Sequence, residues 1–269
     1  MATIHTKVGA TWKEATNVFV KVSGVWKSVN NVYVRQGGVW KGFGITTVLN
    51  ITINTFNYDI FVEAGSPVAA VDVVINIANG IKVGSTTTAT PAMYGTANLP
   101  TGSTVVINNL GKIQGKGGDA NAGTGGVALQ LVATTTIDNT AGNIWGGGGG
   151  GGEGGQSRLN IADDEEPASY VYVNGGAGGG GAGLNGGTGC NVGTVTSGGA
   201  GCAGAIYQTV IGGAGGLGGA PGTNGSLGGA GSFTPNSPGG IAGKAVNLNT
   251  FTPVWTGGNN ATQVRGLVS

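Results

Sequence analysis

The densest group of chemically active side chains is a run of four carboxylates, Asp163, Asp164, Glu165 and Glu166. Clustered carboxylate oxygens can bind Ca²⁺, and a carboxylate pair about 5–9.5 Å apart can hydrolyse glycosidic bonds. These four acids are adjacent, however, and their spacing is not that of an EF-hand calcium loop. The pattern favours a solvated acidic loop that could complement a basic patch on a partner. We expect no catalytic residue and no metal site.

The other candidates for chemistry are one histidine and two cysteines. His5 is the only histidine, so neither a histidine-based triad nor a histidine-containing zinc site can be assembled. Cys190 and Cys202 lie in a glycine-bounded segment. A disulfide between them would close a loop of about a dozen residues and stabilise the fold by about 3 kcal/mol. Two reduced thiols fit the sequence equally well.

Glycine dominates the second half of the chain, with 38 of the 60 glycines between Gly146 and Gly243. Many short matches to the nucleotide-binding glycine pattern follow from this composition. None lies between a predicted strand and a helix, so we expect no cofactor. From Gly213 to Gly231 every third residue is glycine. Collagen is excluded because the chain has only eight prolines and short glycine islands.

The three-residue period predicts a bundle of polyproline II-type helices formed by one chain folding back and forth. Such helices have three residues per turn and no internal hydrogen bonds. Their buried N–H and C=O groups must therefore pair with neighbouring helices, and glycine removes the Cβ that would block this approach. At about 3.1 Å per residue, residues 213–231 would span roughly 56 Å. We expect instead a reversal at residues 221–226, giving two short helices.

A rigid glycine bundle positions the inserts between its islands. The glycine islands are residues 146–155, 175–189, 198–204 and 212–231. The inserts contain Tyr170, Tyr172, Tyr207 and Phe233. Loops rich in tyrosine, serine and asparagine on a rigid framework are typical of recognition surfaces. We predict receptor binding by these aromatic residues, with the acids at 163–166 contributing charge; capping of the bundle ends is the alternative.

The first 43 residues contain a 14-residue repeat that places Trp12, Trp26 and Trp40 in register. Alternating β-branched and aromatic residues predict strands joined at Ser23-Gly24 and Gly37-Gly38, hence a small β-meander. The module carries a net charge of +5. We interpret it as an attachment region in which the three tryptophans take part, together with Lys27 and Arg35. Interleaved basic and aromatic residues could also bind single-stranded nucleic acid, but a polar sheet face docked on a protein is favoured.

Four regions follow from these patterns. They are an attachment module at 1–44, a β-rich middle domain at 45–145, the helix bundle with its loops at 146–243, and a C-terminal return segment at 244–269. The predicted fold class is mainly β with a polyglycine II helix sandwich and little or no α-helix. No apolar h-region or 18-residue apolar run occurs, so we expect neither a signal peptide nor a transmembrane helix.

The stretch VVINIANGIKVGSTTTATPAMYGTANLPTGSTVVINNLGKIQGKGGDANAGTGGVALQL (73–131), followed by IDNTAGNIWGGGGGGGEGG (137–155), resembles the glycine-rich distal tail-fibre adhesins of T-even-type phages. The C-terminal tips of some siphophage central fibres are similar. The resemblance implies a β-rich attachment region, a polyglycine helix sandwich, and distal loops that select an outer-membrane protein or a surface glycan. It also implies a virion protein made in the host cytoplasm that acts outside the host cell.

The leading hypothesis is a non-enzymatic receptor-binding adhesin at a tail-fibre tip. Its partners would be a host outer-membrane protein or surface glycan and, through the N-terminal module, a tail-fibre or other virion protein. We expect neither nucleic-acid binding nor membrane insertion. The alternatives are a structural or ice-binding polyglycine protein, because springtail antifreeze proteins resemble the glycine islands, and a surface-glycan depolymerase.

Overall fold

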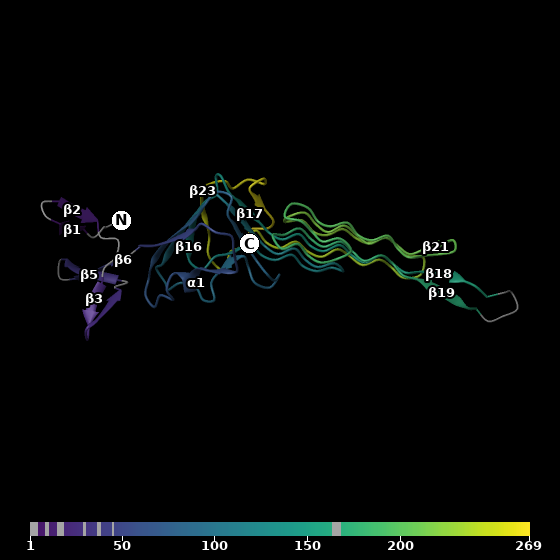
Figure 1. Ribbon diagram of the computed structural model, residues 1–269, viewed down its shortest axis with the longest axis horizontal. Coiled ribbons are helices and arrows are strands. Elements are labelled where there is room, and N and C mark those ends of the chain that lie inside the picture. The colour runs from purple at the N-terminus through teal and green to yellow at the C-terminus, as the bar shows by residue number, and fades with distance from the viewer. Residues whose placement is uncertain are drawn as a thin grey trace.

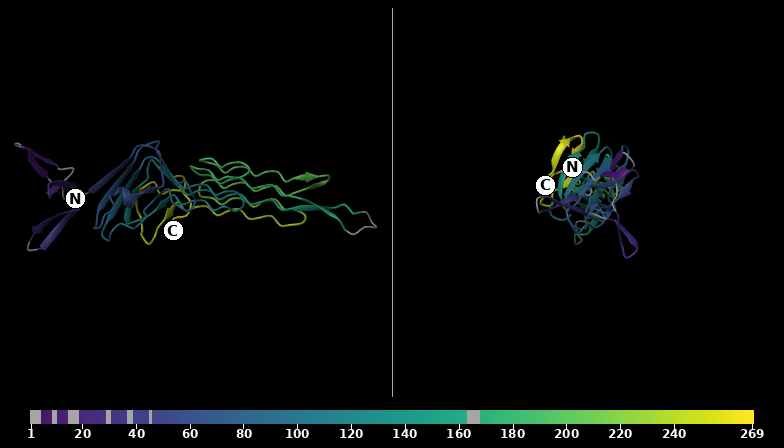
Figure 2. Two further views of the ribbon diagram at one scale, coloured as in Figure 1. Left: turned by 60° about the horizontal axis from the view of Figure 1, so that its bottom comes forward. Right: turned by 90° about the vertical axis from the view of Figure 1, so that its left-hand side faces the viewer.

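The computed structural model describes residues 5–8, 11–14, 19–28, 31–36, 39–44, 46–162 and 168–269. The molecule is elongated, with three N-terminal hairpins at one end and a glycine-rich bundle reaching toward the other (Figures 1 and 2). A β-structure formed by both the middle and the C-terminal part of the chain lies between them. The tryptophan repeat and the aromatic inserts therefore lie at opposite ends of the molecule (Figure 1).

Each tryptophan of the repeat lies in its own antiparallel hairpin. The hairpin strands are β1 (His5–Val8) with β2 (Thr11–Glu14), β3 (Phe19–Val22) with β4 (Val25–Ser28), and β5 (Asn31–Gln36) with β6 (Val39–Gly44). Positive φ angles at Ser23 and Gly24 confirm the turn predicted there. The described strands pair only within their own hairpin, so three two-stranded sheets stand where the repeat predicted one meander. In register, a basic residue lies opposite each tryptophan: Lys7 opposite Trp12, Lys21 opposite Trp26, and Arg35 opposite Trp40.

Residues 46–145 and 245–269 coil into three parallel sheets, a parallel β-helix. The first sheet contains β7 (Thr46–Ile51), β10 (Asp72–Ile77), β13 (Thr104–Asn109), β16 (Thr134–Asp138) and β23 (Val254–Gly257). The second contains β8 (Thr55–Phe56), β11 (Lys82–Gly84), β14 (Lys112–Gln114), β17 (Asn143–Trp145) and β24 (Val264–Arg265). The third contains β9 (Tyr58–Asp59), β12 (Met93–Tyr94), β15 (Leu129–Gln130) and β22 (Val246–Asn247). The only helix among the described residues, α1 (Ile60–Glu63), is one turn long.

In-register stacking of like residues holds the coils together. Ile75, Ile107 and Ile137 are directly paired on neighbouring strands, and each is fully buried. Alternation then directs the next residue of each strand outward, where Asn76 donates to Asn50 (2.9 Å) and Asn108 donates to Asn76 (2.8 Å). Three neighbouring coils thus share an apolar layer inside, and the first three coils share a hydrogen-bonded amide ladder outside.

The glycine-rich segments leave the β-helix at a single corner, between the second and the third sheet. Three successive coils carry an insertion there: residues 85–92, 115–128 and 146–245. The chain returns after the longest insertion to add β22, β23 and β24. The segment predicted as a C-terminal return thus supplies strands to all three sheets.

Hydrogen bonds between the glycine segments recur every three residues. Gly148, Gly151 and Gly154 donate to the carbonyls of Ala182, Gly179 and Gly176 at 2.8–3.0 Å. This spacing is that of polyproline II-type helices, whose backbone groups bond only to neighbours. The segment 146–155 is central because it exchanges backbone hydrogen bonds with six others. These neighbours are residues 118–121, 123–126, 176–182, 213–219, 223–229 and 237–243.

The uninterrupted run Gly146–Gly152 follows from this central position. A Cβ on Gly149, Gly150 or Gly151 would lie 2.0, 1.8 or 2.1 Å from the carbonyl oxygen of Gly240, Asp119 or Gly216 respectively. Residues three apart form one row along such a helix. All three rows of this segment therefore face the backbone of neighbouring segments. Glu153, three residues after Gly150, is exposed because the neighbouring segment has turned back, with Gly123 donating to Asp119. The glycine run therefore ends where the neighbouring segment no longer covers this row.

The predicted reversal after Gly219 is confirmed. Gly222 has φ +69°, and Thr223 donates to the carbonyl of Ala220. Beyond the turn the chain runs back beside itself, because Ser226 donates to Leu217 and Gly229 donates to Ala214. Residues 213–231 form two short antiparallel helices.

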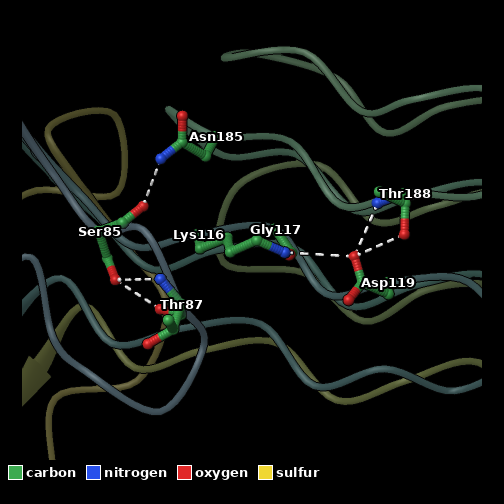
Figure 3. A network of polar contacts seen from close by, with 7 residues as sticks. All are labelled: Ser85, Thr87, Lys116, Gly117, Asp119, Asn185 and Thr188. Atoms are coloured by element: carbon green, nitrogen blue, oxygen red, sulfur yellow. Dashed lines mark hydrogen bonds and ion pairs between the residues drawn. The ribbon is translucent and has the colours of Figure 1, made fainter.

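Polar side chains tie the three insertions to each other (Figure 3). Asn185 Nδ2 donates to the carbonyl of Ser85 at 2.7 Å. Asp119 accepts from the backbone and hydroxyl of Thr188 at 2.8 and 2.9 Å, and pairs with the Lys116 ammonium at 3.2 Å. Burial raises the pKa of Asp119, but the hydrogen bonds from Thr188 and Lys116 outweigh it and hold the pKa below its ordinary value. The base of the bundle is thereby fixed to the β-helix.

A disulfide joins Cys190 to Cys202 across a sequence separation of 12. Both cysteines also donate backbone hydrogen bonds to the segment 176–182, at Gly178 and Ala177. The disulfide links two segments of the bundle that both pack against the segment 176–182.

Replacing Gly150 by alanine is expected to destabilise the protein by about 1–3 kcal/mol or more, because the new methyl group meets backbone that cannot move independently. The measurement is thermal unfolding followed by circular dichroism. Glu153→Ala is the matched control, since it lies in the same row of the same segment but is exposed. Equal melting temperatures for the two variants would contradict the close packing described for this row.

Replacing both Cys190 and Cys202 by serine is expected to cost about 3 kcal/mol of unfolding free energy, because the bridge restricts the unfolded chain. Denaturant unfolding of the oxidised protein, the reduced protein and the double variant measures this. The reduced protein and the variant should unfold together, at lower denaturant than the oxidised protein. Coincidence of all three curves would show that the bridge contributes nothing to stability.

Candidate functional site

Two short hairpins end the bundle on the side away from the N-terminal strands (Figure 1). One pairs β18 (Ser157–Asn160) with β19 (Tyr170–Val173), and the other pairs β20 (Ile206–Tyr207) with β21 (Val210–Ile211). They begin where glycine gives way to β-branched and aromatic residues, which favour strands over the glycine helix. Ala205 donates to the carbonyl of Asn174 at 3.0 Å, so the bases of the two hairpins are joined.

One face of the first hairpin gathers aromatic rings around an arginine. Arg158 pairs with Tyr172 and Asn160 pairs with Tyr170, so alternation places these four residues on the same face. The Arg158 guanidinium carbon lies 4.5 Å from the ring centroid of Tyr170 and 4.7 Å from that of Phe233. The rings of Tyr172 and Phe233 are 5.0 Å apart and tilted. We call Arg158, Tyr170, Tyr172 and Phe233 the arginine–aromatic cluster.

The cluster is packed and yet open to solvent. Tyr172 is 52% exposed and Phe233 is 42% exposed, although each contacts the other. On the neighbouring hairpin Ile206 and Ile211 are 69% and 58% exposed. Large apolar side chains held in this way at an exposed tip mark an interaction site. Aromatic residues and arginine are the types that contribute most to binding energy at protein interfaces.

The side chains of this surface can offer contacts for recognition. It presents ring faces and edges, tyrosine hydroxyls, and a guanidinium with five N–H donors in a planar fork. Within the described parts of the chain, no group of three or more histidine, cysteine, aspartate or glutamate side chains could hold a metal ion. A search of the same residues finds no helix of the length and apolar character needed to cross a membrane.

The structure brings together three of the four aromatic residues predicted for binding. Tyr170, Tyr172 and Phe233 belong to the cluster, whereas Tyr207 lies on the second hairpin and makes no ring contact with them among the described residues. Asp163, Asp164, Glu165 and Glu166 fall outside the described residues. The loop that contains them connects β18 to β19.

The residues predicted for attachment lie at the opposite end of the molecule. Trp12, Trp26 and Trp40 each occupy the second position of the second strand in their hairpin. Lys27 is in β4 and Arg35 is in β5. Their side chains are outside what the structure describes, so their role stays a prediction.

Sequence reasoning missed Arg158, the residue at the centre of the cluster. A signal for it was present, because Arg158 is the only basic residue between Gly117 and Gly243. A single arginine near tyrosines, in an insert whose other charged residues are all acidic, is the pattern that could have found it.

Comparisons with known proteins agree with this architecture. The family model of the phage tail fibre adhesin Gp38 matches residues 46–267. Among solved structures, the chain resembles the crystal structure of the gp37–gp38 adhesin tip complex of the bacteriophage S16 long tail fiber. That match has a TM-score of 0.52 and 24% sequence identity, and it covers 84% of this chain and 83% of the other. A search of curated proteins gave no match.

The family match begins with β7 and runs through the glycine bundle to β24. It therefore spans the β-helix, the bundle and both distal hairpins, and it leaves out only the N-terminal hairpins and the last two residues. The resemblance inferred from residues 73–155 is confirmed by this match. The chain belongs to the phage tail fibre adhesin Gp38 family.

Proposed function

We propose that this tail-fibre tip adhesin binds its host receptor through the two distal hairpins, with the arginine–aromatic cluster at the centre of the contact. The observation that carries the proposal is the exposure of Tyr172 and Phe233 in a packed cluster at the far end of the bundle. Rings already held in place lose little conformational freedom on binding. Several fibres on one virion would then convert modest affinity into avidity.

An outer-membrane protein is the receptor class that this surface favours. Ile206 and Ile211 are branched aliphatic side chains exposed beside the cluster, and a polar glycan would leave them without apolar partners. A protein loop can cover them and also supply acceptors for Arg158. Tyr207, on the same hairpin as the isoleucines, and the acids at 163–166 extend the proposed contact. A surface glycan is the second candidate.

The opposite end attaches the adhesin to the virion in this proposal. The solved relative is a complex of gp38 with gp37, and by analogy a fibre protein would bind the present chain. The three hairpins carry the basic and tryptophan positions for that contact, including Lys27 and Arg35. The glycine bundle then acts as a rigid spacer, and the protein works by binding alone, at the outside of the host cell.

Replacing Tyr172 and Phe233 together by alanine is expected to weaken binding to susceptible cells more than tenfold, because interface aromatic residues of this kind commonly contribute 2 kcal/mol or more. The measurement is binding of the fluorescently labelled chain to a panel of Gram-negative strains, with and without protease treatment of the cells. Loss of binding after proteolysis identifies a protein receptor, and its persistence identifies a glycan.

Leu227→Ala is the control, because this leucine is as exposed as the cluster but lies in the bundle rather than in a distal hairpin. Its binding should equal that of the unaltered chain. The proposal fails if replacing residues 159–173 and 205–211 with glycine and serine leaves strain-selective binding unchanged. Release of saccharide from the cells would instead favour a depolymerase, and thermal hysteresis would favour an ice-binding protein.

A further inference from the structure

Three cationic side chains gather on the outer face of the second sheet, far from the distal hairpins. Lys82 and Lys112 are paired in register on the adjacent strands β11 and β14. Arg265 lies on β24, next to Trp145 of β17. All three are half-buried. They come from three different coils of the β-helix, so the fold and not the local sequence assembles them.

None of the three head groups makes an ion pair or a hydrogen bond among the residues that the structure describes. The ion pair found there joins Lys116 to Asp119 instead. Like charges on adjacent strands repel one another. Burial lowers the pKa of Lys112, and the charges of Lys82 and Arg265 lower it further. The group thus concentrates positive charge without an acceptor.

Stacking on a tryptophan explains part of this arrangement. The Lys112 ammonium lies 3.6 Å from the centroid of the Trp145 ring, and the Arg265 guanidinium carbon lies 4.4 Å from it. These contacts orient two of the cations. They do not neutralise the charge, and Lys82 makes no such ring contact among the described residues.

A cavity of about 200 Å³ opens beside the two lysines. It lies at the corner between the first and the second sheet, and Lys82, Lys112, Asn79, Asn143, Gly80 and Gly111 contribute to its lining. No carboxylate lines it. The bundle covers the neighbouring row of the same face, where Gln114 Nε2 donates to the carbonyl of Val195 at 2.8 Å. The bundle does not cover the two lysines in the same way.

We propose that this cavity binds the phosphate group of a phosphorylated saccharide. A phosphate monoester carries a charge of about −1.5 to −2 at pH 7 and three acceptor oxygens, which suits the two lysines that line the cavity better than a single carboxylate does. The side-chain amides of Asn79 and Asn143 can donate to and accept from sugar hydroxyls. The cavity is open to solvent, so a saccharide joined to the phosphate can extend out of it.

This site is independent of the proposed receptor contact, because it belongs to the β-helix and not to the distal hairpins. Figure 1 shows β17, on the strand row of this face, well separated from β18 and β19. An adhesin with both sites would hold a phosphorylated surface saccharide at its base while its tip engages a receptor.

The test follows the indole N–H signal of Trp145 by nuclear magnetic resonance, in the full chain labelled with ¹⁵N-tryptophan. Trp145→Phe assigns the signal. Glucose 1-phosphate, inorganic phosphate and glucose are titrated separately at low ionic strength. Glucose 1-phosphate is expected to give a saturable shift, inorganic phosphate a weaker affinity, and glucose no shift.

Lys82→Gln is expected to weaken the glucose 1-phosphate affinity about tenfold, because it removes a charged hydrogen-bond donor to the phosphate. Lys82 does not contact Trp145, so this variant leaves the reporter's surroundings in place. Lys244→Gln, which alters a lysine that donates to the Ser269 carbonyl, should bind like the unaltered chain. Absence of a saturable shift, or equal affinity in the Lys82→Gln variant, would overturn the site. Equal affinity for glucose 1-phosphate and inorganic phosphate would overturn its assignment to a saccharide.

Discussion

Backbone hydrogen bonding between chains that carry no Cβ is the constraint on which the rest of this structure depends. A polyproline II-type helix cannot satisfy its own N–H and C=O groups, so each segment of the bundle is stable only inside a lattice of others. Segment 146–155 shows the limiting case, with six neighbours and glycine in all three rows. Ordering so much glycine is entropically unfavourable. The lattice compensates by pairing the backbone groups of its inner segment with those of its neighbours, and the β-helix corner holds the segments together at one end.

The number of glycine rows in a segment reports how many of its faces are buried. In GGAGGLGGA, residues 212–220, two rows are glycine and the third carries Ala214 and Leu217, which are exposed. In the run Gly146–Gly152 all three rows are glycine and all are covered. The sequence therefore indicates how many neighbours surround each segment of the lattice. Rows that carry side chains face solvent. This rule also explains why the large exposed aromatic side chains lie at the bundle's end, since its interior is made of glycine.

Much of the fold could be predicted because its signals are local. A β-rich middle domain was predicted at residues 45–145, the three-residue period predicted the bundle, and the turn residues at 221–226 predicted its reversal. The three-sheet coil could not be predicted, because nothing within β15 shows that its neighbour β22 lies more than a hundred residues further along the chain. In the candidate site, the positions of Tyr170, Tyr172 and Phe233 followed from their inserts. Arg158 did not, because its role depends on Phe233, which only the folded lattice brings beside it.

The placement of the long insertion within a coil of the β-helix ties the two halves of the molecule into one folding unit. After β17 the chain leaves for the bundle, and only on its return does it form β22 and the last coil. The pairing of β22, β23 and β24 with β15, β16 and β17 closes a loop that contains the whole bundle. Contacts so distant in sequence make for slow folding. The C-terminal coil therefore holds the returning end of the bundle on the same β-helix from which the bundle leaves, so loss of its pairing would free one of the bundle's two connections.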